Sequence, residues 1–140
     1  MSKERTEKAI IHAFLELLNN YPLDKITVKD IVNACGISRN TFYYHYQDIY
    51  DLLGATFDSV AELVFREDVT TWQQSLRSCT QFALDNRRAV YHVYRSGHRE
   101  QLERYLYRVT QERMDRLIRH LTRDLTISEE DISYLTLFYK

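Results

Sequence analysis

The stretch from Thr27 to Tyr46, TVKDIVNACGISRNTFYYHY, constrains the fold more than any other part of the chain. Thr27 and Asp30 have the spacing with which two side chains satisfy the free N–H groups at a helix start. The apolar residues that follow recur at the spacing of one helix face, at Val28, Ile31, Val32 and Cys35. Gly36 favours a left-handed helix stop, and Ser38 is a preferred cap for a second helix. The stretch therefore predicts a helix-turn-helix.

The second helix of this motif is predicted to carry its polar groups outward. At about 100° per residue, Arg39, Asn40, Tyr43 and Tyr44 fall within an arc of about 140°, while Phe42 points back toward the first helix. Arginine can form paired hydrogen bonds with guanine, and asparagine with adenine. Tyrosine offers a hydroxyl for phosphate and a ring for the thymine methyl group. This face suits the DNA major groove, and the alternative is a surface helix whose polar face is only solvated.

Two further residues of the same helix, Thr41 and His45, lie beside this arc. From there a side chain would meet the phosphate backbone more naturally than a base edge. The basic residues near the termini and loops of residues 1–50 are open to two interpretations, phosphate contacts or ordinary surface charge: Lys3, Arg5, Lys8 and Lys25.

The segment ITVKDIVNACGISRNTFYYHYQDIYDLL resembles the DNA-binding domain of the TetR family of transcriptional regulators. The matching residues are Thr27, the run Ala34-Cys35-Gly36, Ser38, and the run Thr41-Phe42-Tyr43-Tyr44-His45-Tyr46. The resemblance covers about the first third of the chain. The tyrosine-rich run followed by QDIYDLL is most similar to the subgroup related to dihydroxyacetone-kinase regulators. One position departs from the family pattern, because Ile49 stands where members usually carry a phosphate-binding lysine.

The resemblance implies a sequence-specific regulator, a repressor by default, that binds a palindromic double-stranded operator as a homodimer. It implies operator contacts through the second helix of the motif and a phosphate contact at the start of the first. The resulting set of predicted DNA-binding residues is Thr27, Lys29, Ser38, Arg39, Asn40, Thr41, Tyr43, Tyr44 and His45.

Composition supports a helical globular protein. The 140 residues are 44% hydrophobic and include three glycines and one proline. No apolar run approaches the ~18 residues of a membrane span, and the first ten residues lack the apolar core of a secretory signal. We therefore expect a cytoplasmic protein without a membrane partner. Cys35 and Cys79 lie on predicted apolar faces, and we expect both to be buried thiols.

The charge balance leaves a second hypothesis open. The net charge is −1, and residues 1–50 contain six basic and six acidic side chains, although DNA affinity rests heavily on phosphate neutralisation. A dimer that focuses a few contacts at two half-sites would still suffice. The alternative is a protein-interaction module, or a regulator that docks a coactivator, with weak DNA binding of its own.

The rest of the chain also has helical periodicity. We predict an all-α protein with a helix-turn-helix domain at residues 1–47 and a helical ligand-binding and dimerisation domain at 48–140, of which 48–66 form a connecting helix. Apolar spacing predicts helices that begin near Trp72 and Asn86, a long helix from about His98 to Arg123, and a last one after Ser128. That last helix reaches Lys140 without a stop signal, whereas the resemblance implies one more helix and a dimer interface formed by the final pair. We therefore expect a C-terminally truncated chain with a compromised or rebuilt dimer interface.

The second half is rich in aromatic residues, and the resemblance implies a pocket there for an unknown small-molecule effector. We predict Trp72, Phe82 and Tyr94 as its wall, and the alternative is that each is an ordinary core residue. Residues 66–124 hold twelve basic and eight acidic side chains, a surplus of four positive charges. That surplus indicates either a solvated face with salt bridges or a surface for a partner protein or anionic ligand. No spacing indicates a metal site, a cofactor or a catalytic group.

Overall fold

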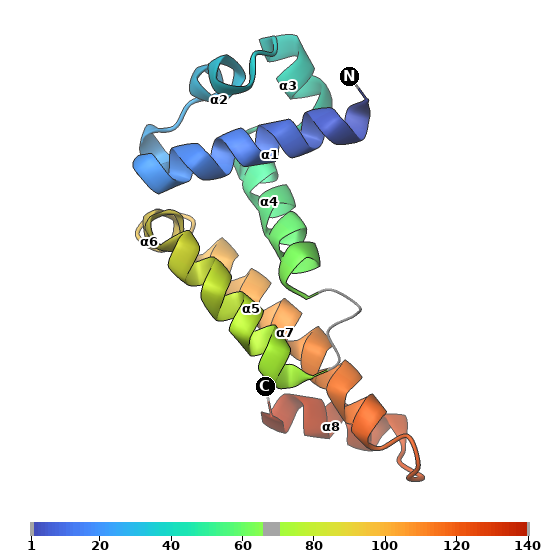
Figure 1. The fold of residues 1–140 in the computed structure, drawn as a ribbon. Helices are drawn as coiled ribbons and strands as arrows, with labels where there is room; N and C mark the ends of the chain where they lie inside the picture. The colour runs from blue at the N-terminus through green and yellow to red at the C-terminus, as the bar shows by residue number, and fades with distance from the viewer. Residues whose placement is uncertain (1, 66–70, 140) are drawn as a thin grey trace. The chain divides into compact units, whose positions relative to one another are not determined.

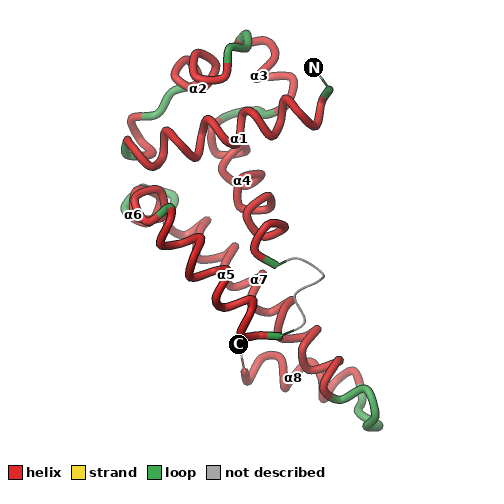
Figure 2. Tube along the Cα trace, in the orientation of Figure 1, coloured by secondary structure: helices red, strands yellow, loops and turns green. Residues whose placement is uncertain are grey.

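The computed structural model describes residues 2–65 and 71–139, and within these ranges the chain is all-α, as predicted (Figure 1). Figure 2 shows that the loops between most helices are short. The helices are α1 (Lys3–Asn20), α2 (Val28–Cys35), α3 (Arg39–His45), α4 (Ile49–Val64), α5 (Trp72–Asp85), α6 (Arg87–Tyr94), α7 (Arg99–Leu121) and α8 (Glu129–Tyr139), with a short 3-10 helix η1 (Leu23–Lys25). None of the helices in the described ranges is long and apolar enough to cross a membrane.

Contacts divide the chain into two compact units, residues 1–99 and residues 100–140. In the first unit the fully buried side chains come from the first four helices, namely Ile10, Phe14, Leu18, Ile31, Phe42, Leu52 and Leu53. Full burial of one such side chain stabilises the fold by roughly 1.5–3 kcal/mol. This core joins α1 and α4 to the helix-turn-helix formed by α2 and α3. In Figure 1, α2 and α3 lie together along one side of α1.

Within the first unit, α6 packs against α1, and polar side chains join the two helices. The Asn19 amide donates from Nδ2 to Asn86 Oδ1 at 3.0 Å and accepts at Oδ1 from the Ala89 N–H at 3.2 Å. Asn86 is the N-cap residue of α6, but its side chain makes no capping hydrogen bond to that helix. Asn19 therefore caps α6 from another helix. His92 Nδ1 adds a hydrogen bond to the Leu18 carbonyl at 2.5 Å.

In the second unit, a charged bridge joins α8 to α7, and each of the two helices has a few buried residues. The buried residues are Val109, Ile118, Ile132 and Thr136. Arg119 donates through Nη1 and Nη2 to both oxygens of Glu129, at 2.9 and 2.7 Å, and through Nε to Asp115 at 2.8 Å. The bonds from Arg119 lower the pKa of Glu129 below its usual value. The exposed ion pairs of α7 thus include one network, centred on Arg119, that extends to α8.

Several expectations about burial were wrong in detail. Helix α5 has no buried residue, so its apolar spacing does not mark a covered face. Tyr94, for which the alternative prediction was an ordinary core residue, is 44% exposed, because Ala89 and Val93 form the covered face of α6. Cys35 and Cys79, which were expected to be buried, are half-buried. The expected end of the connecting helix, Arg66, lies outside the described residues.

The cap on α6 predicts a specific loss of stability. Asn19→Ala removes both bonds to α6 and is expected to lower the free energy of unfolding by about 1–2 kcal/mol. Asn20→Ala is the matched control, because Asn20 also donates to a carbonyl four residues back, in this case Glu16, but reaches no other helix. It should change stability by less than about 0.5 kcal/mol. Urea unfolding followed by circular dichroism measures both, and equal effects would contradict the capping role.

Candidate nucleic-acid interface

The start of α2 is held by a reciprocal pair of hydrogen bonds, as predicted. The Thr27 hydroxyl accepts from the Asp30 N–H at 3.2 Å, and the Asp30 carboxylate accepts from the Thr27 N–H at 2.9 Å. The backbone bond from Thr27 is the main reason that the pKa of Asp30 lies below its usual value. The side chain of Thr27 therefore already serves as a cap, and Thr27 and Lys29 both remain exposed at the surface.

The turn between the two helices is also the predicted one. Gly36 ends α2 with a left-handed backbone (φ 68°, ψ 36°), and the Ile37 N–H donates to the Val32 carbonyl at 3.1 Å. Ser38 then caps α3, because its hydroxyl accepts from the Thr41 N–H at 3.1 Å. The hydroxyl groups of Ser38 and Thr41 lie 2.9 Å apart. This turn sets the direction in which α3 leaves α2.

Helix α3 presents the predicted outward face. Phe42 is 0% exposed, whereas Tyr43 and Tyr44 are 48% and 78% exposed. Arg39 and Asn40 are exposed on the same helix. The Tyr43 ring packs edge-on against Phe42, with ring centroids 5.4 Å apart, and this contact orients one of the outward phenols. A guanidinium, an amide and two phenols thus stand exposed on one face.

His45 lies elsewhere than the sequence predicted. Its side chain is only 4% exposed, and Nδ1 lies 3.2 Å from Oε1 of Glu7 on α1. A phosphate cannot reach an imidazole that is covered in this way, so the geometry does not support the predicted DNA contact through this side chain. The prediction missed Glu7 as the partner. The signal was available, because Glu7 precedes the buried Ile10 and Phe14 by three and seven positions and so belongs to the covered face of α1.

The first position of α4 lacks the basic side chain that members of the family usually have there. Ile49 is half-buried at the start of α4, and the neighbouring acids serve as caps. The Asp48 carboxylate accepts from the Asp51 N–H at 2.8 Å, and the Asp51 carboxylate accepts from the Gln47 N–H at 2.9 Å. The start of α4 therefore carries two carboxylates and no basic side chain, which disfavours a phosphate contact there.

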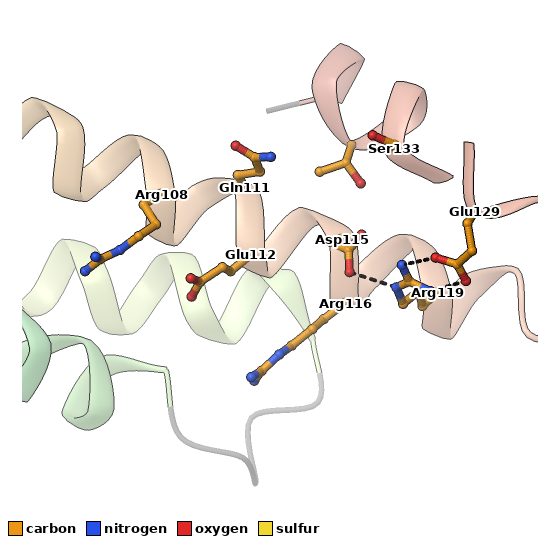
Figure 3. Close-up of a pocket in the computed structure, with 9 residues that line it drawn as sticks. Arg108, Gln111, Glu112, Asp115, Arg116, Arg119, Glu129 and Ser133 are labelled. Carbon is orange, nitrogen blue, oxygen red and sulfur yellow. Dashed lines mark hydrogen bonds and ion pairs between the residues drawn. The ribbon is translucent and has the colours of Figure 1, made fainter. Parts of the chain in front are cut away.

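The second unit contains a cavity of about 530 Å³ between α7 and α8 (Figure 3). Its lining is charged and polar, and includes Arg108, Gln111, Glu112, Arg116, Arg119 and Glu129. Figure 3 shows Arg119 held between Asp115 and Glu129, so that its guanidinium is already occupied by protein carboxylates. Among the residues that the structure describes, none that lines this cavity is aromatic.

The residues predicted for an aromatic pocket are not brought to this cavity. Trp72 opens α5 and is 56% exposed, Phe82 lies half-buried near the end of α5, and Tyr94 ends α6. Tyr94 instead lies under the guanidinium of Arg99, whose Cζ is 4.1 Å from the ring centroid. A role in ligand binding stays a prediction for all three.

Comparison with known proteins assigns the class. Residues 10–56 match the family described as bacterial regulatory proteins, tetR family. Residues 70–140, half of the chain, match the family described as a transcriptional regulator C-terminal region. Together with the helix-turn-helix geometry, these matches show which family of transcriptional regulators the chain comes from. The chain belongs to the TetR family.

One similar protein is the HTH-type dhaKLM operon transcriptional activator DhaS of Lactococcus lactis subsp. lactis (strain IL1403). The two are 36% identical over 73 residues, a stretch that covers 51% of this chain. The same stretch covers only 39% of the relative. The similarity agrees with the expected subgroup without assigning this chain the activity of the relative.

The left-handed turn predicts a position-specific effect of adding a methyl group. Gly36→Ala is expected to cost about 1–2 kcal/mol of unfolding free energy, because only the backbone angle opposes a side chain there. Nothing lies within 4 Å of the added carbon at Gly36 or at Gly97, and Gly97 has no positive φ. Gly97→Ala should therefore change stability by less than about 0.5 kcal/mol in the same urea titration. A loss of similar size at both glycines would show that the turn does not depend on its left-handed residue.

Proposed function

We propose that this protein binds a palindromic DNA operator as a homodimer and inserts α3 of each protomer into the major groove. The observation that carries the proposal is the exposed face of α3, on which Arg39, Asn40, Tyr43 and Tyr44 stand opposite the buried Phe42. A helix whose apolar side is fully covered can present its polar side without exposing the core. Residues 1–47 would form the reading domain and residues 48–140 the regulatory one.

Each outward group has a partner in the groove. Arg39 would pair with guanine N7 and O6, and Asn40 with adenine N6 and N7. Tyr43 and Tyr44 would contact a thymine methyl group or a phosphate. Lys29, Thr27, Ser38 and Thr41 would meet the backbone, with the hydroxyl groups already oriented by the caps of α2 and α3. His45 does not belong to this set because its side chain is covered.

The equal number of basic and acidic side chains in the DNA-binding part of the chain fits a mode of binding that depends more on base contacts than on phosphate contacts. Residues 1–50 are neutral overall, so few counterions would be released on binding. We therefore expect weak non-specific affinity and a shallow dependence on salt. This expectation also distinguishes the proposal from a protein-interaction module, which would show no specific shift at any salt concentration.

We propose that the C-terminal helices sense an effector in the cytoplasm and change operator affinity. The charged cavity between α7 and α8 favours a polar effector over an apolar one. Repression is the default mode of regulation in this proposal. Activation is the second candidate, favoured by the similarity to the Lactococcus lactis protein, which is a transcriptional activator.

The DNA-binding proposal predicts a loss of specificity without a loss of fold. Duplexes are selected from a randomised pool by the purified chain, and an inverted repeat should emerge. Arg39→Ala and Tyr43→Ala should each weaken the shift of that duplex by about 1–3 kcal/mol, because each removes a groove contact. The unfolding free energy should change by less than about 0.5 kcal/mol in Arg39→Ala, because that side chain is exposed. It should fall by about 0.5–1.5 kcal/mol in Tyr43→Ala, which also removes the edge-on contact with Phe42, and both variants should stay folded.

Matched controls separate groove contacts from general charge and aromatic effects. Arg88→Ala removes an exposed arginine on α6, and Tyr21→Ala removes a tyrosine that is 54% exposed at the end of α1. Both variants should retain the wild-type shift. Sequence-specific binding retained by Arg39→Ala and Tyr43→Ala together would refute the assigned roles.

A further inference from the structure

The recognition helix α3 is too short to hold its own direction. It has seven residues, and helices of this length depend on tertiary contacts for their stability. Ser38 caps its start, and Phe42 buries its middle. Tyr46, the cap that follows its last residue, is also buried, at 7% exposed. A short helix held in this way keeps its angle only as well as its C-terminal end is held. The angle at which Arg39 and Asn40 meet the bases therefore depends on what holds the far end.

We propose that His45 and Glu7 form a clamp that holds the C-terminal end of α3 on α1, so that both act as positioning residues for DNA recognition. His45 is the last residue of α3, three positions after Phe42. Its imidazole is covered, and its Nδ1 lies 3.2 Å from the Glu7 carboxylate. The inference rests on the proposed function, because it assumes that α3 reads DNA.

The chemistry of the contact defines the protonation of the ring. A carboxylate can only accept a hydrogen bond, so the Nδ1 atom of His45 must carry the proton that lies between the two groups. The charge of the Glu7 carboxylate also affects the pKa of a second residue. Tyr46, which caps α3 and is 7% exposed, has a pKa raised to about 12 by burial first and then by the charges of Glu7 and Asp51. Glu7 thus lies close to the last residue of α3 and to its cap.

The clamp makes a prediction opposite to simple electrostatics. An acidic side chain near a DNA-binding surface repels phosphate, so removing its charge should strengthen DNA binding. If Glu7 instead holds α3, removing its acceptor weakens binding although the protein becomes less negative. The sign of the effect therefore separates the two roles.

The test uses paired variants and the duplex enriched by the wild-type chain from a randomised pool. Glu7→Leu and His45→Leu each remove one side of the clamp and should lower affinity about tenfold. Glu7→Gln keeps an acceptor without the charge, and His45→Asn keeps a donor near the Nδ1 position. Both should stay within about threefold of wild type. The double variant with leucine at both positions should be no weaker than either single variant.

Two controls separate the clamp from a change in surface charge and from a direct phosphate contact. Glu4→Leu removes an acid from the same helix, one that is 79% exposed and paired with Lys8, and it should not weaken binding. The salt dependence of binding should be the same for His45→Leu and wild type. A phosphate-contacting histidine would instead reduce the salt slope by about one when removed.

A measurement without DNA keeps the clamp testable on its own. Nitrogen NMR of the imidazole should show a proton on Nδ1 of His45 in the wild-type chain and in Glu7→Gln. That signal should be lost or exchange rapidly in Glu7→Leu. If the wild-type chain enriches no duplex, the proposed function fails while this spectrum still decides the clamp. If Glu7→Leu does not fold, Glu7→Gln and the comparison of His45→Asn with His45→Leu decide it.

Three results would overturn the clamp. The first is stronger or unchanged DNA binding by Glu7→Leu together with weaker binding by His45→Leu, which would make His45 a direct DNA ligand. The second is a reduced salt slope for His45→Leu. The third is an imidazole that carries its proton on Nε2 and is insensitive to Glu7→Leu.

Discussion

The burial of Phe42 is the constraint on which the DNA-binding face depends. Phe42 is 0% exposed at the centre of α3, and the other fully buried side chains of this core come from α1, α2 and α4. Because successive helix residues are rotated by about 100°, a covered Phe42 leaves Arg39, Asn40, Tyr43 and Tyr44 on the uncovered side. If Phe42 were not covered, the helix would have no preferred face. The chemistry offered to DNA thus follows from an apolar contact.

Helix α1 contacts another helix of the first unit near each of its two ends. Near its start, Glu7 contacts His45 at the end of α3, and near its end, Asn19 caps α6. The same helix therefore touches the part of the chain that would read DNA and a helix of the part that would regulate it. A change in α6 is joined to the recognition helix through one continuous element, whose buried face includes Ile10 and Phe14.

Local patterns predicted the helix-turn-helix well because each signal involves residues close in sequence. The Thr27–Asp30 capping pair, the left-handed Gly36 and the Ser38 cap connect residues no more than five positions apart. Their geometry is almost independent of the rest of the fold. The apolar face of α5 was less informative. Its spacing is that of a helix, but spacing does not say whether another element covers that face, and none of its residues is buried.

The sequence by itself determined the all-α class, the family resemblance, the caps and the outward face of α3, because these follow from short-range periodicity and hydrogen bonding. Only the tertiary structure decided the partners of His45 and Asn19. Glu7 is 38 positions from His45, and Asn86 is 67 positions from Asn19. Such pairs form only when helices already packed by their apolar faces bring polar groups together, and no local pattern specifies that distance or orientation.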